Sequence, residues 1–116
     1  MNIQRLEVGR RMSQAVVHNG TVYLAGQVAE NAKGSSVGEQ TQSILKQIEQ
    51  LLAAAGTDKS RLLSVTIWLA DISRFEEMNA VYDAWVSPGN PPARACVEAR
   101  LAGSQYLLEV SAIAAV

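Results

Sequence analysis

The spacing of apolar residues changes along this chain between the period of β-strands and the period of α-helices. Residues 15–28 and 61–71 are rich in β-branched and other apolar side chains, which is typical of strands. Residues 38–56 and 73–86 instead repeat apolar side chains every three or four positions, as amphipathic helices do. Residues 15–28 hold two strands, so the predicted order of elements is ββαβαββ. The last two strands of this predicted order lie within residues 93–101 and 106–116.

Asn19 and Gly20 separate the two β-rich runs near the start of the chain. Both residue types tolerate the positive φ angles that a type I′ turn requires at its two central positions. The twist of this turn matches the right-handed twist of the strands that it joins. The sequence therefore predicts a β-hairpin with a two-residue loop.

The first helix is predicted from an apolar stripe that ends at a glycine. Gly56 follows the stripe and suits the left-handed conformation in which many helices end. We expect the stripe to pack on one face of a sheet. Its members are Ile44, Leu45, Ile48, Leu51, Leu52 and Ala55.

The second helix is predicted to begin at Ser73, because Glu76 follows three positions later at the spacing of a capping box. The proline-rich segment "SPGNPP" ends this helix, since proline lacks a backbone donor and disfavours helical geometry in the residue before it. We interpret its aromatic and methionine stripe as core packing rather than as a cofactor site. The stripe consists of Phe75, Met78, Tyr82 and Trp85.

This order of elements predicts a single domain over residues 1–116, built as an α+β two-layer sandwich with a mixed sheet and two helices on one face. The strand at 61–71 is almost continuously apolar, which favours an interior position in the sheet. The sheet face away from the helices still needs cover. We expect it to include Val65, Ala25 and Cys96 and to be buried between copies of the chain, which predicts a homo-oligomer.

Composition excludes several classes of function. The net charge is −1, and 10 basic residues are scattered among 11 acidic ones, so no basic stripe is available for nucleic acid. No apolar run reaches the ~20 residues that span a bilayer, and the N-terminus lacks the apolar core of a signal peptide, so a cytoplasmic protein is expected. One cysteine and one histidine cannot form a metal cluster, and neither a metal nor another cofactor is expected.

The segment "NPPARACVEARLA" places Arg94 in a strand that has one apolar face. Read with a period of two, Arg94 and Cys96 lie on the face opposite to Ala93, Ala95 and Val97. An arginine there can simply be solvated. It can also bind a carboxylate in bidentate fashion through its planar guanidinium group.

Glu109 is the unusual residue of the last predicted strand, because its neighbours are apolar and an unpaired carboxylate there carries a desolvation cost. A structural ion pair with Arg94 and a functional site are equally consistent with this pattern. In the functional interpretation Arg94 anchors a small acid and Glu109 passes a proton to and from water. We interpret the Cys96 side chain as part of the packed core. Its backbone N–H could form a second contact with a bound carboxylate.

At these residues the chain resembles the RidA family of reactive-intermediate deaminases, also called YjgF-like proteins. The segments "NPPARACVEARL" and "LLEVSAIAAV" carry most of the resemblance, with "SQAV…NGTVYLAGQV" and "MNAVYDAWV" in the same order. It implies a chorismate-mutase-like homotrimer with clefts between subunits. It also implies hydrolysis of enamines and imines to 2-oxo acids and ammonia, as in 2-iminobutanoate/2-iminopropanoate deaminase. Arg94 would bind the carboxylate, beside Cys96, and Glu109 would direct the water.

The chain resembles a divergent member of that family. The archetype has a tyrosine where this chain has Met12 and a serine where it has Ala25, and both positions would lie near the substrate. Two hydroxyl contacts are therefore lost, while Arg94 and Glu109 are kept. The loop from Glu30 to Gly38 is also shorter than in the archetype.

Three other functions stay open. The same cleft and Arg94 could belong to a trimer that binds a 2-oxo acid or an amino acid without catalysis, although Glu109 favours an enzyme. A purely structural trimer would only pair Arg94 with Glu109. Ribonuclease or translation-inhibitor activity is disfavoured by the weakly acidic composition.

Overall fold

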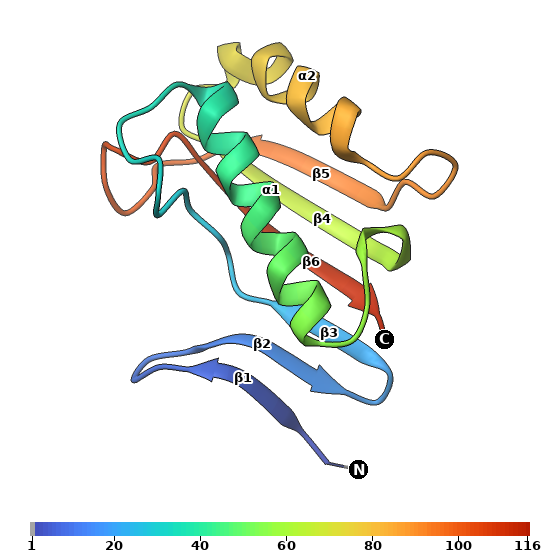
Figure 1. The fold of residues 1–116 in the computed structure, drawn as a ribbon. Coiled ribbons are helices and arrows are strands. Elements are labelled where there is room, and N and C mark those ends of the chain that lie inside the picture. The colour runs from blue at the N-terminus through green and yellow to red at the C-terminus, as the bar shows by residue number, and fades with distance from the viewer. Residues whose placement is uncertain (1) are drawn as a thin grey trace.

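The computed structural model describes residues 2–116 and has two α-helices packed on the same face of a six-stranded mixed sheet (Figure 1). The predicted α+β two-layer sandwich is therefore confirmed. No helix in this part of the chain is long and apolar enough to cross a membrane. The helices are α1 (Val37–Ala54) and α2 (Phe75–Trp85). The strands are β1 (Gln4–Val8), β2 (Ser13–His18), β3 (Thr21–Leu24), β4 (Leu62–Leu69), β5 (Ala93–Glu98) and β6 (Leu108–Ala115).

The strands are ordered β1-β2-β3-β6-β4-β5 across the sheet. β4 and β5 are parallel because α2 carries the chain back between them, and the other neighbouring pairs are antiparallel. β4 lies inside the sheet, as its apolar sequence predicts. Its residues Val65, Ile67 and Leu69 are at most 2% exposed and face the helices.

β1 is absent from the predicted order, which has five strands rather than six. It pairs antiparallel with β2 at the edge of the sheet, and of its five residues only Leu6 is partly buried. The others are exposed, so the segment lacks the apolar alternation by which a strand is recognised in sequence. The strand forms because β2 would otherwise leave its backbone hydrogen-bonding groups unpaired.

The hairpin between β2 and β3 is confirmed. Asn19 has φ 53° and Gly20 has φ 79°, the positive values that a type I′ turn requires. Val17 then pairs with Val22, and Ala15 pairs with Leu24. This register places four apolar side chains on the helix-covered face of the sheet.

Helix α1 lies across the sheet and buries the stripe predicted from the sequence (Figure 1). Ile44, Ile48 and Leu52 are at most 1% exposed and belong to one apolar cluster with Ile67 and Val110 of the sheet. Burial of each such side chain contributes roughly 1.5–3 kcal/mol. This cluster fixes α1 on β4 and β6.

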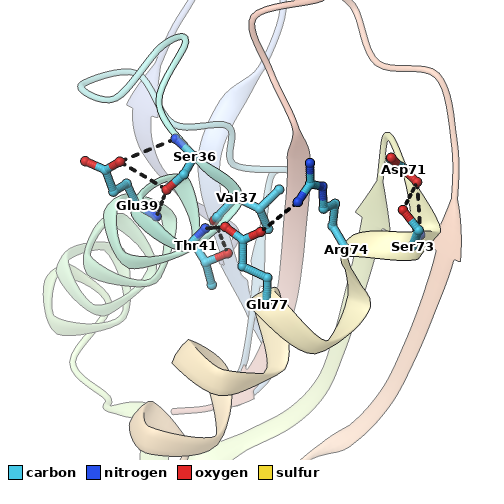
Figure 2. Close-up of polar contacts among 9 residues, drawn as sticks. Ser36, Val37, Glu39, Thr41, Asp71, Ser73, Arg74 and Glu77 are labelled. Atoms are coloured by element: carbon cyan, nitrogen blue, oxygen red, sulfur yellow. Dashed lines mark hydrogen bonds and ion pairs between the residues drawn. The ribbon is translucent and has the colours of Figure 1, made fainter.

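The N-terminus of α1 is closed by a capping box (Figure 2). The Glu39 N–H donates to Ser36 Oγ at 3.2 Å, and the Glu39 carboxylate accepts from the Ser36 N–H at 3.5 Å. Glu77 of α2 accepts from the Gly38 N–H at 3.0 Å and lies 3.6 Å from the Arg74 guanidinium. These contacts join the start of α1 to α2.

The start of α2 differs from the sequence prediction, because Ser73 does not cap it. Ser73 lies in a short 3₁₀ turn, and Asp71 accepts hydrogen bonds from its N–H at 3.0 Å and from its hydroxyl at 2.7 Å (Figure 2). These bonds hold the pKa of the Asp71 carboxyl below its usual value. The α-helix then begins at Phe75 without a side-chain cap. Asp71 therefore caps the 3₁₀ turn that precedes α2 and does not cap α2 itself.

The face of the sheet away from the helices is uncovered in this chain, but its residues differ from those expected. Val65 faces the helices, and Cys96 packs against the apolar cluster there. β4 and β5 pair in a register that turns these two residues inward and their sequence neighbours outward. The outward face carries Val16, Tyr23, Trp68, Val97 and Ile113, of which Tyr23 is 47% and Val97 is 48% exposed.

We predict that Ser36→Ala lowers the free energy of unfolding by about 1 kcal/mol, because the backbone N–H of Glu39 in the first turn of α1 loses its capping partner. Urea denaturation at one fixed protein concentration measures the change. Gln42→Ala, an exposed position inside α1, is the control and should change stability by less than about 0.5 kcal/mol. Equal stability of the Ser36 variant and the control would show that the capping box contributes nothing.

Candidate active site

Arg94 of β5 is held against helix α2. Its Nη1 donates to Asn79 Oδ1 at 2.8 Å, and its guanidinium carbon lies 4.7 Å from the centre of the Tyr82 ring and 5.7 Å from that of Phe75. Aromatic ring faces attract a cation, so the three contacts together fix the plane of the guanidinium. The side chain is nonetheless exposed, and within residues 2–116 its other nitrogens donate to no side chain. An oriented guanidinium with free donors is suited to binding a carboxylate.

The residues that hold Arg94 share one face of α2, where Phe75, Asn79 and Tyr82 are spaced four and three positions apart. Phe75 and Tyr82 are predicted from the sequence to lie in the core. Tyr82 is indeed buried, but its ring also carries Arg94. The missed signal is Asn79, a polar residue between two aromatic ones on a face otherwise assigned to packing.

Burial raises the pKa of the Tyr82 phenol, and the positive charge of Arg94 offsets only part of that effect. The phenol therefore stays neutral at neutral pH. Arg94 contacts the face of an uncharged ring, so its positive charge is not neutralised by Tyr82.

Cys96 follows Arg94 by two positions on the same face of β5 and packs against the apolar cluster. Burial raises the pKa of its thiol, while the charge of Arg94 lowers it by a smaller amount. A thiol with a raised pKa is a weak nucleophile at neutral pH. The environment of Cys96 therefore supports packing rather than nucleophilic catalysis.

Glu109 lies on the opposite face of the sheet. It pairs with Trp68 in the register between β4 and β6, and its side chain is half-buried. On its other side the carboxylate lies against Gly26, where the chain continues beyond β3. Trp68 and Gly26 were not identified from the sequence, because their contact with Glu109 depends on the order of the strands.

The structure does not bring Arg94 and Glu109 together within one chain. Arg94 pairs with Val65 and faces the helices, whereas Glu109 pairs with Trp68 and faces away from them, and β4 lies between their strands. None of the ion pairs within residues 2–116 joins the two side chains. The structural ion pair considered from the sequence is therefore not formed inside this chain.

Ala25 lies near Glu109, because the Glu109 carboxylate lies against the following residue, Gly26. Met12 is 56% exposed and lines a cavity of about 460 Å³ together with Gly26 and with Gln47 and Leu51 of α1. Ala25 precedes Gly26, is half-buried, and donates its N–H to the Gln14 carbonyl at 2.9 Å. Arg94 and Cys96 thus form one group, and Glu109 and Ala25 form a second group on the two sides of Gly26, while Met12 lies at the cavity beside α1.

The functional groups of these residues decide which chemistry the candidate site can perform. Within residues 2–116 no three His, Cys, Asp or Glu side chains are arranged to hold a metal ion. The first group offers an oriented cation, and the second offers a carboxylate on the strand position that pairs with Trp68. A carboxylate-bearing substrate could meet both only if the two groups came from different chains.

Comparisons with known proteins cover almost the whole chain. Residues 2–116 match the family model described as Endoribonuclease L-PSP. The RutC family protein YoaB of Escherichia coli is 41% identical over 116 residues, which is 100% of both chains. A rat protein named 2-iminobutanoate/2-iminopropanoate deaminase is 33% identical over 88% of this chain and 77% of its own. The crystal structure of a YjgF family member from Neisseria meningitidis has a TM-score of 0.95 at 43% identity, covering 99% of this chain and 95% of that one.

We predict that the Cys96 thiol ionises above the usual pKa of a cysteine, and that Arg94→Ala raises this pKa further by removing the charge that favours the thiolate. The ultraviolet absorbance of the thiolate during a pH titration measures the pKa, with Cys96→Ala as the blank that removes the tyrosine signal. A thiol that ionises below the usual cysteine value, or one unaffected by Arg94→Ala, would contradict the account of this group.

Proposed function

The chain belongs to the Endoribonuclease L-PSP family, which includes RutC and YjgF proteins, and on that premise we propose that it hydrolyses reactive enamines and imines to 2-oxo acids and ammonia. The observation that carries this proposal is Arg94, a guanidinium oriented by α2 with donors left for a carboxylate. The name of the rat relative describes an activity on 2-imino acids, which carry such a carboxylate.

The proposed active form is a homotrimer. The uncovered face of the sheet supports association, since it exposes Tyr23 and Val97 and also carries Trp68 and Ile113. Apolar groups exposed on one contiguous face commonly mark an interface between proteins. The number of three subunits comes from the resemblance to the RidA family.

Each proposed site lies between two subunits. Arg94 and Glu109 face opposite sides of one sheet, so they can contact a single small substrate only if two chains contribute them. Arg94 of one subunit binds the substrate carboxylate, with the backbone N–H of Cys96 as a second donor. Glu109 of the neighbouring subunit directs the water. In this proposal Ala25, which lies near Glu109, and Met12, as the family resemblance implies, shape the space for the substrate side chain.

The reaction requires little beyond positioning, because an imine carbon is already electrophilic. The oxygen of the bound water forms a bond to that carbon while Glu109 takes up one water proton. Return of that proton to nitrogen gives a carbinolamine. Transfer of the remaining hydroxyl proton to nitrogen through Glu109 then lets the carbon–nitrogen bond break as the C=O bond forms, which releases ammonia and leaves the 2-oxo acid. Holding the two reactants in contact supplies much of the acceleration, and no metal or organic cofactor enters the proposal.

Met12 and Ala25 affect the substrate preference in this proposal. A thioether and a methyl group stand where the family archetype has hydroxyls, so this side of the site offers apolar contacts rather than hydrogen bonds. We therefore expect apolar imino acids to be preferred over those with polar side chains.

The alternative is a trimer that binds 2-oxo acids or amino acids without catalysis. Arg94 serves both functions equally, whereas Glu109 has a role only in the hydrolase. The family description names an endoribonuclease, but a chain with a net charge of −1 and no basic stripe is poorly suited to RNA. A cytoplasmic location stays a prediction of the sequence.

We predict that Arg94→Ala abolishes imine hydrolysis and weakens binding of 2-oxo acids at least about tenfold, because the substrate carboxylate loses its charged donors. Arg94→Lys should restore little, since an ammonium group cannot form the same planar pair of bonds. Imino acids generated by an amino-acid oxidase are trapped with semicarbazide, and the protein's competition with the trap gives the rate. Arg100→Ala, an exposed arginine in the next loop, is the control. Near-normal hydrolysis by the Arg94→Ala variant would disprove the proposal that Arg94 binds the substrate carboxylate.

We predict that Glu109→Gln lowers kcat by about 10² to 10⁴, because the amide keeps the shape of the side chain but accepts no proton. Binding of 2-oxo acids and the trimer should persist, as calorimetry and light scattering would show. Glu76→Gln, at an exposed position of α2, controls for the loss of one negative charge. Unchanged kcat in Glu109→Gln would contradict the proposal that Glu109 directs the water.

A further inference from the structure

A β-bulge lies beside Glu109 at the end of β3. Tyr23 pairs with Ile113, and Gln27 pairs with Val110. Between these two pairs the chain advances by four residues after β3 but by only three residues along β6. The extra residue falls within the segment that contains Gly26. Bulges of this kind commonly lie next to active sites and redirect a side chain.

The backbone on both sides of Gly26 is fixed. The Gln27 N–H donates to the Val110 carbonyl at 2.7 Å, the Val110 N–H donates back at 3.0 Å, and the Ala25 N–H donates to the Gln14 carbonyl at 2.9 Å. The Gln27 side chain is 6% exposed, donates to Gln14 Oε1 at 2.9 Å, and accepts from Gln47 Nε2 at 3.1 Å. The bulge is therefore tied to β2, β6 and α1.

Glycine at this position is required by space rather than by backbone conformation. Gly26 is not among the glycines with positive φ, so alanine could adopt its backbone angles. A Cβ atom at Gly26 would however overlap the Glu109 carboxylate oxygen and lie 2.9 Å from its Cδ and 3.2 Å from its Cγ. Because the backbone is held by the bonds above, the Glu109 side chain is the part that must move.

We propose that Gly26 is the positioning residue of Glu109, because the absence of a side chain at Gly26 leaves the space that the Glu109 carboxylate occupies. This inference rests on the proposed hydrolase function for its kinetic consequence, but its structural consequence stands independently. A methyl group at position 26 shifts the carboxylate to another rotamer and away from the water that it directs. Arg94, on the opposite face of the sheet, is unaffected.

The kinetic test is Gly26→Ala in the semicarbazide assay. We expect kcat to fall about 10²-fold or more, toward the value of Glu109→Gln, while 2-oxo acid binding and trimer size stay unchanged. Gly38→Ala is the matched control, because a Cβ there would meet other side chains only at 3.7 Å or beyond. Wild-type kcat in Gly26→Ala, or weakened 2-oxo acid binding, would overturn the proposal.

The double variant Gly26→Ala/Glu109→Gln distinguishes positioning from a separate contribution to catalysis. If Gly26 acts through Glu109, the double variant is no slower than Glu109→Gln alone. A further fall similar to that of the single Gly26 variant would show that Gly26 contacts the substrate directly, which also overturns the proposal.

A crystal structure of Gly26→Ala tests the inference even if the wild-type protein proves to hydrolyse no imine. The Glu109 carboxylate should occupy a different rotamer, with Gln27 still bonded to Gln14 and Val110. An unmoved carboxylate with a displaced bulge would contradict the proposal without bearing on the function of the protein.

Discussion

The packing of both helices on one face of the sheet is the constraint on which the rest of this structure depends. It divides the strand residues into an inner set, buried against α1 and α2, and an outer set that no other element within residues 2–116 covers. Side chains alternate between the two faces along each strand, so Arg94 and Glu109 are separated by their registers with β4. The same constraint thus leaves an apolar face exposed and divides the candidate site into two groups.

Each group is held by its own rigid surroundings. Arg94 lies against a helix that is itself tied to the start of α1 through Glu77, so its guanidinium cannot rotate freely. Glu109 is confined between Trp68 and a bulge fixed by the amides of Gln27 and neighbouring side chains. Two small subsites with fixed geometry need only to be brought face to face, which association of identical chains would do symmetrically.

The parts of the fold that depend on local sequence signals could be predicted from the sequence. The face of each strand that turns toward the helices could not. The Asn19-Gly20 turn is recognised by its two residue types, and α1 is recognised by the period of its apolar stripe. β1 forms only because β2 offers it an edge, and the inward face of β5 depends on its pairing with β4, which is distant in sequence. Arg94 could be singled out by its residue type, but its contacts with Asn79 could not.

The central claim is that one substrate meets Arg94 and Glu109 from different subunits, and mixing two inactive variants tests it most directly. Arg94→Ala and Glu109→Gln subunits are exchanged in equal amounts, and mass spectrometry under native conditions verifies that mixed trimers form. Random mixing gives about one site in four with both residues intact, so activity should return to about a quarter of the wild-type rate. Mixed trimers that stay inactive would contradict a site shared between subunits.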